Sequence, residues 1–289
     1  MATLALPDLS IRQLEYLVAI ADAPTWSVAA AQVGVSPSAL SQGLAELERR
    51  VGVDLFESHG RRRVLRASAM PVLDHARQVI ALTRDLLEWS DRMRTARAGR
   101  VRVGMIDIAA VVHFPDVIRS FLTERGDVDL TLSVAPSAAL VDGLRDGNLD
   151  LVVCVEPPSA PTGIDMTRLF SEPLTVIAPP GTTIGKPASW GPWLLFPSGS
   201  HTRRRITERL REIGAPIRIA AESHQPDVLQ QMVALGLGWT VLPVDSEQIT
   251  IRQITIGPEL VSRQLVLATR AGSLHDPAVD ELAEQICSA

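Results

Sequence analysis

Apolar residues near the start of the chain recur every three or four positions, which is the spacing of one face of a helix. The first such segment opens on Ser10 and carries Gln13 three residues later, the signature of a capping box. Pro24 ends this segment, and Thr25 is a preferred cap for a second helix that starts at Trp26. The pattern therefore predicts two short consecutive helices.

A turn with distinctive chemistry precedes the third helical segment. Ala30 is small enough for another helix to cross closely, and Gly34 tolerates the positive φ of a tight turn. Ser36 can cap the new helix, and Pro37 suits its first position, because the missing N–H has no helical partner there. We therefore expect two helices that cross tightly at this turn.

The third helix has one apolar face and one short polar face. Its apolar stripe comprises Leu40, Leu44, Leu47 and Val51. Its outward residues are Ser38, Ser41, Gln42 and Ala45. A small residue, a glycine turn and a buried leucine at these spacings are typical of a helix-turn-helix, whose recognition helix enters the major groove of DNA.

Two short extended runs follow in "VGVDLFESHGRRRVLR", joined around residues 58–60. Arginines gather at the tip and the second run of this predicted hairpin: Arg61, Arg62, Arg63 and Arg66. An ordinary helical hairpin with a solvated basic surface is the alternative, but a basic hairpin behind a recognition helix indicates a winged helix that contacts phosphates. The predicted DNA-binding residues are Thr25, Ser27, Ser36, Pro37, Ser38, Ser41, Gln42, Arg61, Arg62 and Arg63.

Residues 69–97 contain no glycine and are compatible with one long helix after Pro71. A heptad pattern comprises Val72, Ala76, Val79, Thr83, Leu86, Ser90 and Met93, and a second stripe comprises Leu73, Ile80 and Leu87. A helix that packs only on its own domain is the alternative. Because the segment bridges two parts of the chain, we favour a dimerisation helix.

The remainder of the chain alternates apolar strands with amphipathic helices, beginning with "VRVGMIDIA" and "AVVHFPDVIRSFLTERG". This alternation predicts an α/β domain with a parallel sheet and with ligand sites at the carboxyl ends of the strands. A second strand–helix series starts at "PLTVIAPPG", "RQLVLATRAG" follows it, and a helix over residues 277–287 closes the chain.

Charge and composition narrow the functional classes. The 289 residues carry a net charge of −5, divided into +2 over residues 1–100, which hold 13 arginines and no lysine, and −7 over the remainder. The two cysteines, Cys154 and Cys287, are too far apart in sequence to suggest a disulfide framework, a zinc site or a redox pair. We expect no cofactor and no metal.

The sequence has neither an apolar stretch long enough to cross a membrane nor a convincing signal peptide, so we expect a cytoplasmic protein with no membrane partner.

An enzyme is not expected, because the sequence has no nucleophile elbow, no phosphate-binding loop of the Walker type and no paired-histidine metal motif. The alternative function is an enzyme or a solute-binding protein built on the second half, with the N-terminal segment as a regulatory head. A ligand-responsive DNA-binding regulator accounts for every segment.

The front end resembles the LysR-type transcriptional regulators, a bacterial family. The resemblance lies in "IRQLEYLVAIADAPTWSVAAAQVGVSPSALSQGLAELERRVGVDLFE", followed by "GRRRVLR". The usual Ser-Gln-Pro opening of the recognition helix is Ser36-Pro37-Ser38 here. "LRDGNLDLVV", "LFSEPLTVIAP" and "VLQQMVALGLGWTVLPV" resemble the effector-binding domain of the same family, which shares the fold of periplasmic solute-binding proteins.

This resemblance implies an α+β winged helix-turn-helix domain over residues 1–67, a linker and dimerisation helix over 68–98 and an α/β effector-binding domain over 99–289. The last would have two lobes, lobe I over 99–171 plus 265–289 and lobe II over 172–264. It implies sequence-specific binding to double-stranded promoter or operator DNA as a homodimer or homotetramer. A small-molecule effector between the lobes would change the binding geometry.

In such a fold the cleft residues lie where strands give way to helices. The predicted effector-binding residues are Asp107, Ile108, Ser137, Gly199, Ser200, His201, Thr202 and His224. The loop "PSGSHT" could hold a phosphate or carboxylate, or it could be a plain capped turn. Asp107 stands where relatives commonly have a hydroxyl residue, and it could either cap its own helix or meet a cationic group. We expect it to disfavour simple carboxylates at that end of the cleft.

Overall fold

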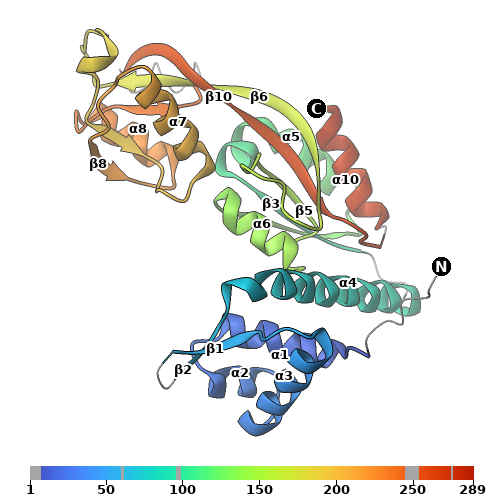
Figure 1. Ribbon diagram of the computed structural model, residues 1–289. Helices are drawn as coiled ribbons and strands as arrows, with labels where there is room; N and C mark the ends of the chain where they lie inside the picture. The colour runs from blue at the N-terminus through green and yellow to red at the C-terminus, as the bar shows by residue number, and fades with distance from the viewer. Residues whose placement is uncertain (1–7, 60–61, 96–98, 245–253, 275) are drawn as a thin grey trace, which may run out of the picture. The chain divides into compact units, whose positions relative to one another are not determined.

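The computed structural model describes residues 8–59, 62–95, 99–244, 254–274 and 276–289. The chain forms two compact units, one built mainly from residues before Ala98 and the other mainly from the residues that follow (Figure 1). Within the described ranges, no helix is long and apolar enough to cross a membrane.

The N-terminal unit consists of helices followed by a two-stranded hairpin and a long helix. Its elements are α1 (Ile11–Asp22), α2 (Trp26–Gln32), α3 (Pro37–Val51), β1 (Phe56–His59), β2 (Arg62–Leu65), the 3-10 turn η1 (Ala67–Ala69) and α4 (Met70–Thr95). Ser10 and Gln13 form the expected capping box, and Ser36 accepts a hydrogen bond from the backbone N–H of Ala39. Gly34 has a φ of 69°, so the glycine turn is confirmed.

The core of this unit confirms most of the predicted helix faces. Leu40, Leu44 and Leu47 are fully buried, and Ala29 and Ala30 are buried in the same core. α1 and α3 approach so closely that a Cβ added at Gly43 would lie 2.6 Å from the ring of Tyr16. The first half of α4 packs into the same core through residues such as Leu73 and Ala76, so this half of the helix does pack on its own domain.

The hairpin differs slightly from the expected one. Ser58 and His59 belong to β1 rather than to the turn, and β1 pairs with β2 in antiparallel register from Phe56 opposite Leu65 to His59 opposite Arg62. The tip at residues 60 and 61, which includes the predicted DNA contact Arg61, lies outside the described residues.

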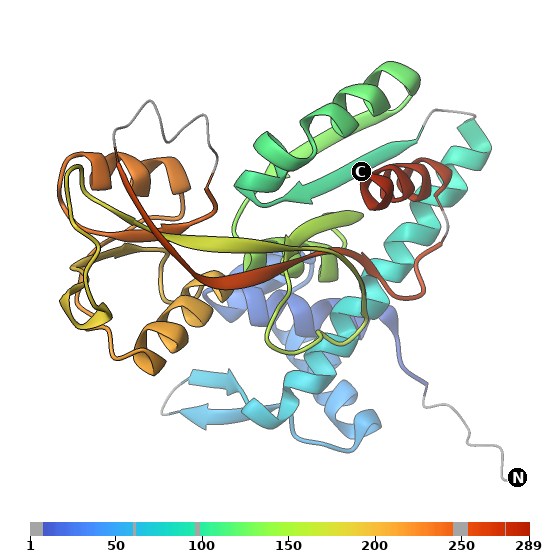
Figure 2. The ribbon, with the colours of Figure 1, turned by 90° about the horizontal axis from the view of Figure 1, so that it is seen from above.

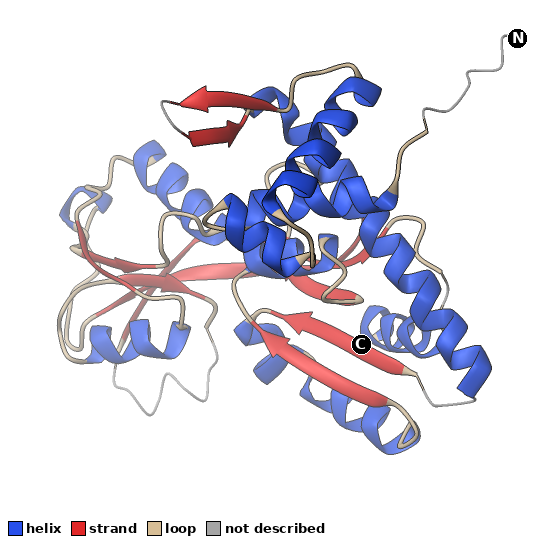
Figure 3. Ribbon diagram, turned by 90° about the horizontal axis from the view of Figure 1, so that it is seen from below, coloured by secondary structure: helices blue, strands red, loops and turns tan. Residues whose placement is uncertain are grey.

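The C-terminal unit contains a six-stranded sheet in the order β4-β3-β5-β10-β6-β9 and a separate parallel pair, β7-β8. The strands are β3 (Arg100–Met105), β4 (Asp129–Val134), β5 (Leu151–Val155), β6 (Ile164–Ala178), β7 (Trp193–Leu195), β8 (Ile219–Glu222), β9 (Thr240–Leu242) and β10 (Thr255–Arg270). The helical elements are the π-helical turn η2 (Ala109–His113), α5 (Pro115–Glu124), α6 (Ser137–Arg145), the 3-10 turn η3 (Pro187–Ser189), α7 (His201–Glu212), α8 (Pro226–Ala234) and α10 (Pro277–Ser288). Figure 3 shows helices on both sides of the strands.

The expectation of a parallel sheet is only partly correct. β3 pairs in parallel with β4 and β5, but β10 runs antiparallel to both β5 and β6. β6 and β10 are also much longer than their sequence patterns indicated, at 15 and 16 residues. They lie side by side along the length of the unit (Figure 2). Polar residues and prolines interrupt both strands, which obscured their true length in the apolar pattern.

Two separate hydrophobic cores flank these long strands. Leu265–Ala268 of β10 belong to the first core, together with β3, β5, α6 and α10. Leu174 of β6 and Leu260 of β10 belong to the second, together with β7, β9, α7 and α8. We refer to the parts around the first and second cores as lobe I and lobe II. Both long strands pass from one lobe to the other, so their midpoints form the connection between the lobes.

Candidate functional site

The predicted DNA-contacting residues of the helices lie at the amino-terminal ends of α2 and α3. Thr25 caps α2 by accepting a hydrogen bond from the N–H of Val28 over 3.2 Å. Ser36 caps α3 in the same way, and its hydroxyl lies 2.9 Å from that of Ser38. The exposed members of the set are Thr25, Ser27, Ser36, Pro37, Ser38 and Gln42, whereas Ser41 is half-buried. Gln42 is therefore the longest exposed polar side chain among the predicted α3 contacts.

Arg63 of the hairpin has an intramolecular role that the sequence did not reveal. Its guanidinium lies over the rings of Trp26 and Phe56, at 5.4 and 5.3 Å from their centroids. It also lies 3.4 Å from the carboxylate of Glu48 at the end of α3. Glu48 in turn accepts hydrogen bonds from the backbone N–H groups of Leu55 and Phe56. Arg63 thus stacks the hairpin onto α2 and α3.

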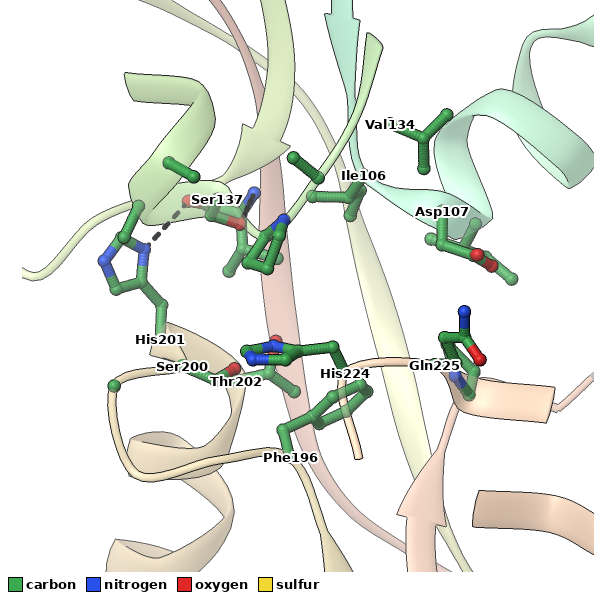
Figure 4. Close-up of a pocket in the computed structure, with 18 of the residues that line it drawn as sticks. Ile106, Asp107, Val134, Ser137, Phe196, Ser200, His201, Thr202, His224 and Gln225 are labelled. Atoms are coloured by element: carbon green, nitrogen blue, oxygen red, sulfur yellow. Dashed lines mark hydrogen bonds between the residues drawn. The ribbon is translucent and has the colours of Figure 1, made fainter. Parts of the chain in front are cut away.

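The C-terminal unit holds a pocket of about 540 Å³ with walls from both lobes (Figure 4). All eight predicted effector-binding residues line it: Asp107, Ile108, Ser137, Gly199, Ser200, His201, Thr202 and His224. Lobe I also contributes the apolar side chains of Ile106, Val134 and Val155, and lobe II contributes Phe196 and Gln225. The volume lies within the usual range for small-molecule sites.

Several of the predicted polar groups already hold parts of the pocket together. The Ser137 hydroxyl accepts a hydrogen bond from the N–H of Val155 over 3.2 Å, and His201 Nδ1 lies 3.4 Å from the carbonyl oxygen of the same residue. The His201 contact joins α7 of lobe II to the end of β5 in lobe I. Ser200 caps α7, so "PSGSHT" is both a capped turn and a wall of the pocket.

Asp107 differs from these groups because its carboxylate makes no hydrogen bond to any residue that the structure describes. No side chain caps η2, so the alternative in which Asp107 caps its own helix is wrong. The side chain is half-buried, and Gln225 faces it across the pocket in Figure 4. Burial raises the pKa of the Asp107 carboxyl above its usual value, and the nearby charge of Asp227 raises this pKa further.

A buried ionic network beside the pocket was not predicted. Glu172 of β6 and Arg263 of β10 are direct cross-strand partners, only 5% and 4% exposed, and Arg263 Nε donates to Glu172 Oε2 over 2.6 Å. His113 Nε2, in lobe I, lies 2.6 Å from Glu172 Oε1, and Arg263 Nη1 donates to Thr202 Oγ1 over 3.1 Å.

This network connects η2 to the pocket wall at the point where the long strands pass between the lobes. Burial alone would raise the pKa of the Glu172 carboxyl, but the hydrogen bond with His113 and the charge and hydrogen bond of Arg263 outweigh it, so the pKa lies below its usual value. A glutamate and an arginine that interrupt apolar runs were the available signal in the sequence. Their pairing required the register of strands whose paired residues are 91 positions apart.

The cysteines and metal-binding side chains add no further site. Cys154 lies in the core of lobe I and Cys287 is exposed on α10. Among the described residues, no group of three or more His, Cys, Asp or Glu side chains could hold a metal ion.

Comparisons with known proteins place both units in one family. Residues 11–69 match the family model "Bacterial regulatory helix-turn-helix protein, lysR family", and residues 94–288 match the "LysR substrate binding domain". A probable hydrogen peroxide-inducible genes activator of Streptomyces viridosporus is 29% identical over 95% of this chain and 92% of its own length. The RuBisCO operon transcriptional regulator of Allochromatium vinosum is 26% identical over 96% of each chain.

Solved structures agree with this relationship. Full-length OxyR from Pseudomonas aeruginosa is 25% identical, with a TM-score of 0.63 over 96% of this chain and 94% of its own. The regulator CbnR in complex with its target DNA shares the fold, with a TM-score of 0.57 and 22% identity over 96% of this chain and 99% of its own. The chain therefore belongs to the LysR family of transcriptional regulators, with an N-terminal helix-turn-helix domain that binds DNA and a C-terminal two-lobed effector-binding domain.

Proposed function

We propose that this protein regulates transcription by changing its binding geometry on promoter DNA when a small molecule occupies the pocket between the lobes. The observation that carries the proposal is the pocket itself, which has walls from both lobes and lies beside the strands that connect them. A ligand there contacts both lobes at once, so it favours one arrangement of the lobes over another. Coupling of this kind is usually worth about 1–3 kcal/mol.

The DNA-binding part of the proposal assigns α3 to the major groove and the hairpin to the phosphate backbone. Gln42 and Ser38 are exposed on α3 and would contact base edges. Thr25 and Ser27 at the start of α2 and the arginines of the hairpin would contact phosphates. We keep residues 1–67, 68–98 and 99–289 as the proposed boundaries of the DNA-binding domain, linker helix and effector-binding domain.

The oligomeric part of the proposal is a homodimer joined through α4, with a homotetramer as the larger assembly on DNA. Near the carboxyl end of α4, Leu86, Leu87 and Trp89 are 51%, 63% and 40% exposed. Clustered exposed apolar side chains of this size usually mark a protein interface. A second α4 in a coiled-coil arrangement would cover them.

A gel-shift titration against DNA tiling the region upstream of the gene tests the DNA-binding assignment. We expect specific retardation by the wild-type protein and a loss of about 1–3 kcal/mol of binding free energy in Gln42→Ala. Gln231→Ala is the matched control, because it removes an exposed glutamine from α8 in the other unit. Retardation that is equally strong on all sequences, or that is unchanged in Gln42→Ala, would contradict the assignment of α3.

A further inference from the structure

The charges around the pocket are unevenly distributed. Arg263 is the one arginine among the described lining residues, and its charge is compensated by the buried carboxylate of Glu172. His201 already lies against the carbonyl oxygen of Val155. Asp107, by contrast, has no hydrogen-bonding or ionic partner among the described residues and stands in the wall of the cavity. Its carboxylate is the one acidic side chain among the lining residues.

The surroundings of Asp107 make a second negative charge unfavourable there. Ile106 is buried beside it, and Ile108 and Val134 contribute further apolar surface to the same wall. Asp227, at the start of α8, already acts on Asp107 as a like charge. In a partly desolvated site of this kind a like charge is repelled more strongly, and an opposite charge attracted more strongly, than in bulk water.

The opposite side of the pocket has a different character. Ser200, His201 and Thr202 at the amino-terminal end of α7 supply hydroxyl, ring and backbone N–H groups, which suit an acceptor on the ligand. Phe196 lies between this end and Gln225 in Figure 4, and Val155 adds apolar surface next to His201. A bound molecule therefore meets a carboxylate at one end, the rings of Phe196 and His224 in the middle and hydrogen-bond donors at the other end.

From this arrangement we infer that the ligand carries a cationic amine that forms an ion pair with Asp107, on an apolar body that lies against Phe196. The inference rests on the proposed function, since it assigns a chemical class to the ligand of the same pocket. Gln225 faces Asp107 in Figure 4 with its side-chain amide nitrogen on the near side, so the carboxylate of Asp107 is the acceptor for the amine at this end of the pocket. Asp107 thus acts as a specificity determinant that accepts amines and rejects simple carboxylates.

Three probes on the same carbon skeleton test this inference: phenethylamine, phenethyl alcohol and phenylacetate. Saturation-transfer difference NMR detects their weak binding to the full-length protein, and titration gives dissociation constants. Asp107→Asn removes the charge but keeps the size of the side chain. Asp165→Asn is the matched control, because Asp165 is an exposed carboxylate on β6 and is not among the residues of the pocket.

We expect phenethylamine to bind the wild-type protein and Asp165→Asn equally, and to bind Asp107→Asn at least about tenfold more weakly, as for loss of a charge-assisted hydrogen bond. Phenylacetate should bind the wild-type protein more weakly than the amine and should gain affinity in Asp107→Asn. A melting temperature of Asp107→Asn at or above that of the wild type shows that the variant is folded, since the substitution removes a partly desolvated charge.

The other outcomes separate this inference from the proposed function. If phenylacetate binds the wild-type protein more tightly than phenethylamine, or if Asp107→Asn leaves amine binding unchanged, the ligand class is wrong but the pocket remains an effector site. Equal binding of the alcohol and the amine also overturns the ion pair. If no probe of any charge binds, the inferred ligand class is overturned, whereas the proposed function stands or falls with the gel-shift titration.

Discussion

The two cysteines of the C-terminal unit show how burial controls the chemistry of one residue type. Cys154 is fully enclosed in the first core, and this burial raises the pKa of its thiol to about 12, so the reactive thiolate is almost absent at neutral pH. Cys287 is exposed on α10. The two thiols therefore lie in different environments.

Alkylation by iodoacetamide at pH 8 should consequently modify one thiol per native chain. We expect Cys287→Ser to abolish this fast reaction and Cys154→Ala to leave it unchanged, with mass spectrometry counting the added groups. Cys154 should react only after the protein is unfolded in guanidinium chloride. Rapid modification of Cys154 in the native protein would show that the first core opens far more readily than its packing indicates.

At the scale of elements, the pairing of β6 with β10 places opposite charges in a buried position. Removing one partner of a buried ion pair leaves the other charge uncompensated, which usually costs about 3–5 kcal/mol. Glu172→Gln should therefore lower the free energy of unfolding by about 3 kcal/mol, measured by urea titration with tryptophan fluorescence. Glu259→Gln, an exposed substitution on β10, should change it by less than about 0.5 kcal/mol. Equal effects of the two variants would mean that the network contributes little.

The same network predicts a pH dependence. The pKa of Glu172 is lower in the folded protein than its ordinary value of 4.5, so the unfolded chain binds the proton more tightly. The stabilisation from Glu172 is thus fully present above pH 4.5 and is lost as the pH falls through the lower, folded value. We expect the difference in stability between the wild type and Glu172→Gln to narrow as the pH decreases below 4.5, and a constant difference would contradict the assignment.

At the scale of the whole molecule, the exposed apolar residues near the carboxyl end of α4 determine the expected assembly. Leu87→Asp places a charge on that surface and should shift the protein from dimer or tetramer toward monomer in sedimentation velocity experiments. Val64→Asp, which puts the same charge at an exposed apolar position of the hairpin, should leave the oligomeric state unchanged. If both variants sediment like the wild type, α4 does not form the interface.

Local sequence patterns determine the helix caps and the tight turn of the N-terminal unit without any tertiary contact. The caps at Ser10, Thr25 and Ser36 and the positive φ of Gly34 depend on residues only a few positions apart, so the sequence contains the whole physical cause. The order of these elements was enough to suggest the family. The eight residues predicted for the cleft also lie around one pocket, because strand ends come together at one edge of a sheet in each lobe and the two edges face the same cavity.

Only the tertiary structure decided how distant residues pair. Arg63 was predicted as a phosphate contact, and its position over Trp26 and Phe56 depends on where the hairpin folds back. Glu172 and Arg263 become partners only through the register of two long strands, and Asp107 is left without a partner only because no neighbouring side chain reaches it. The sequence determined the elements and their caps, since those energies are local. The burial and pairing of charges required the fold, since desolvation and ionic contacts depend on every group that packs around a side chain.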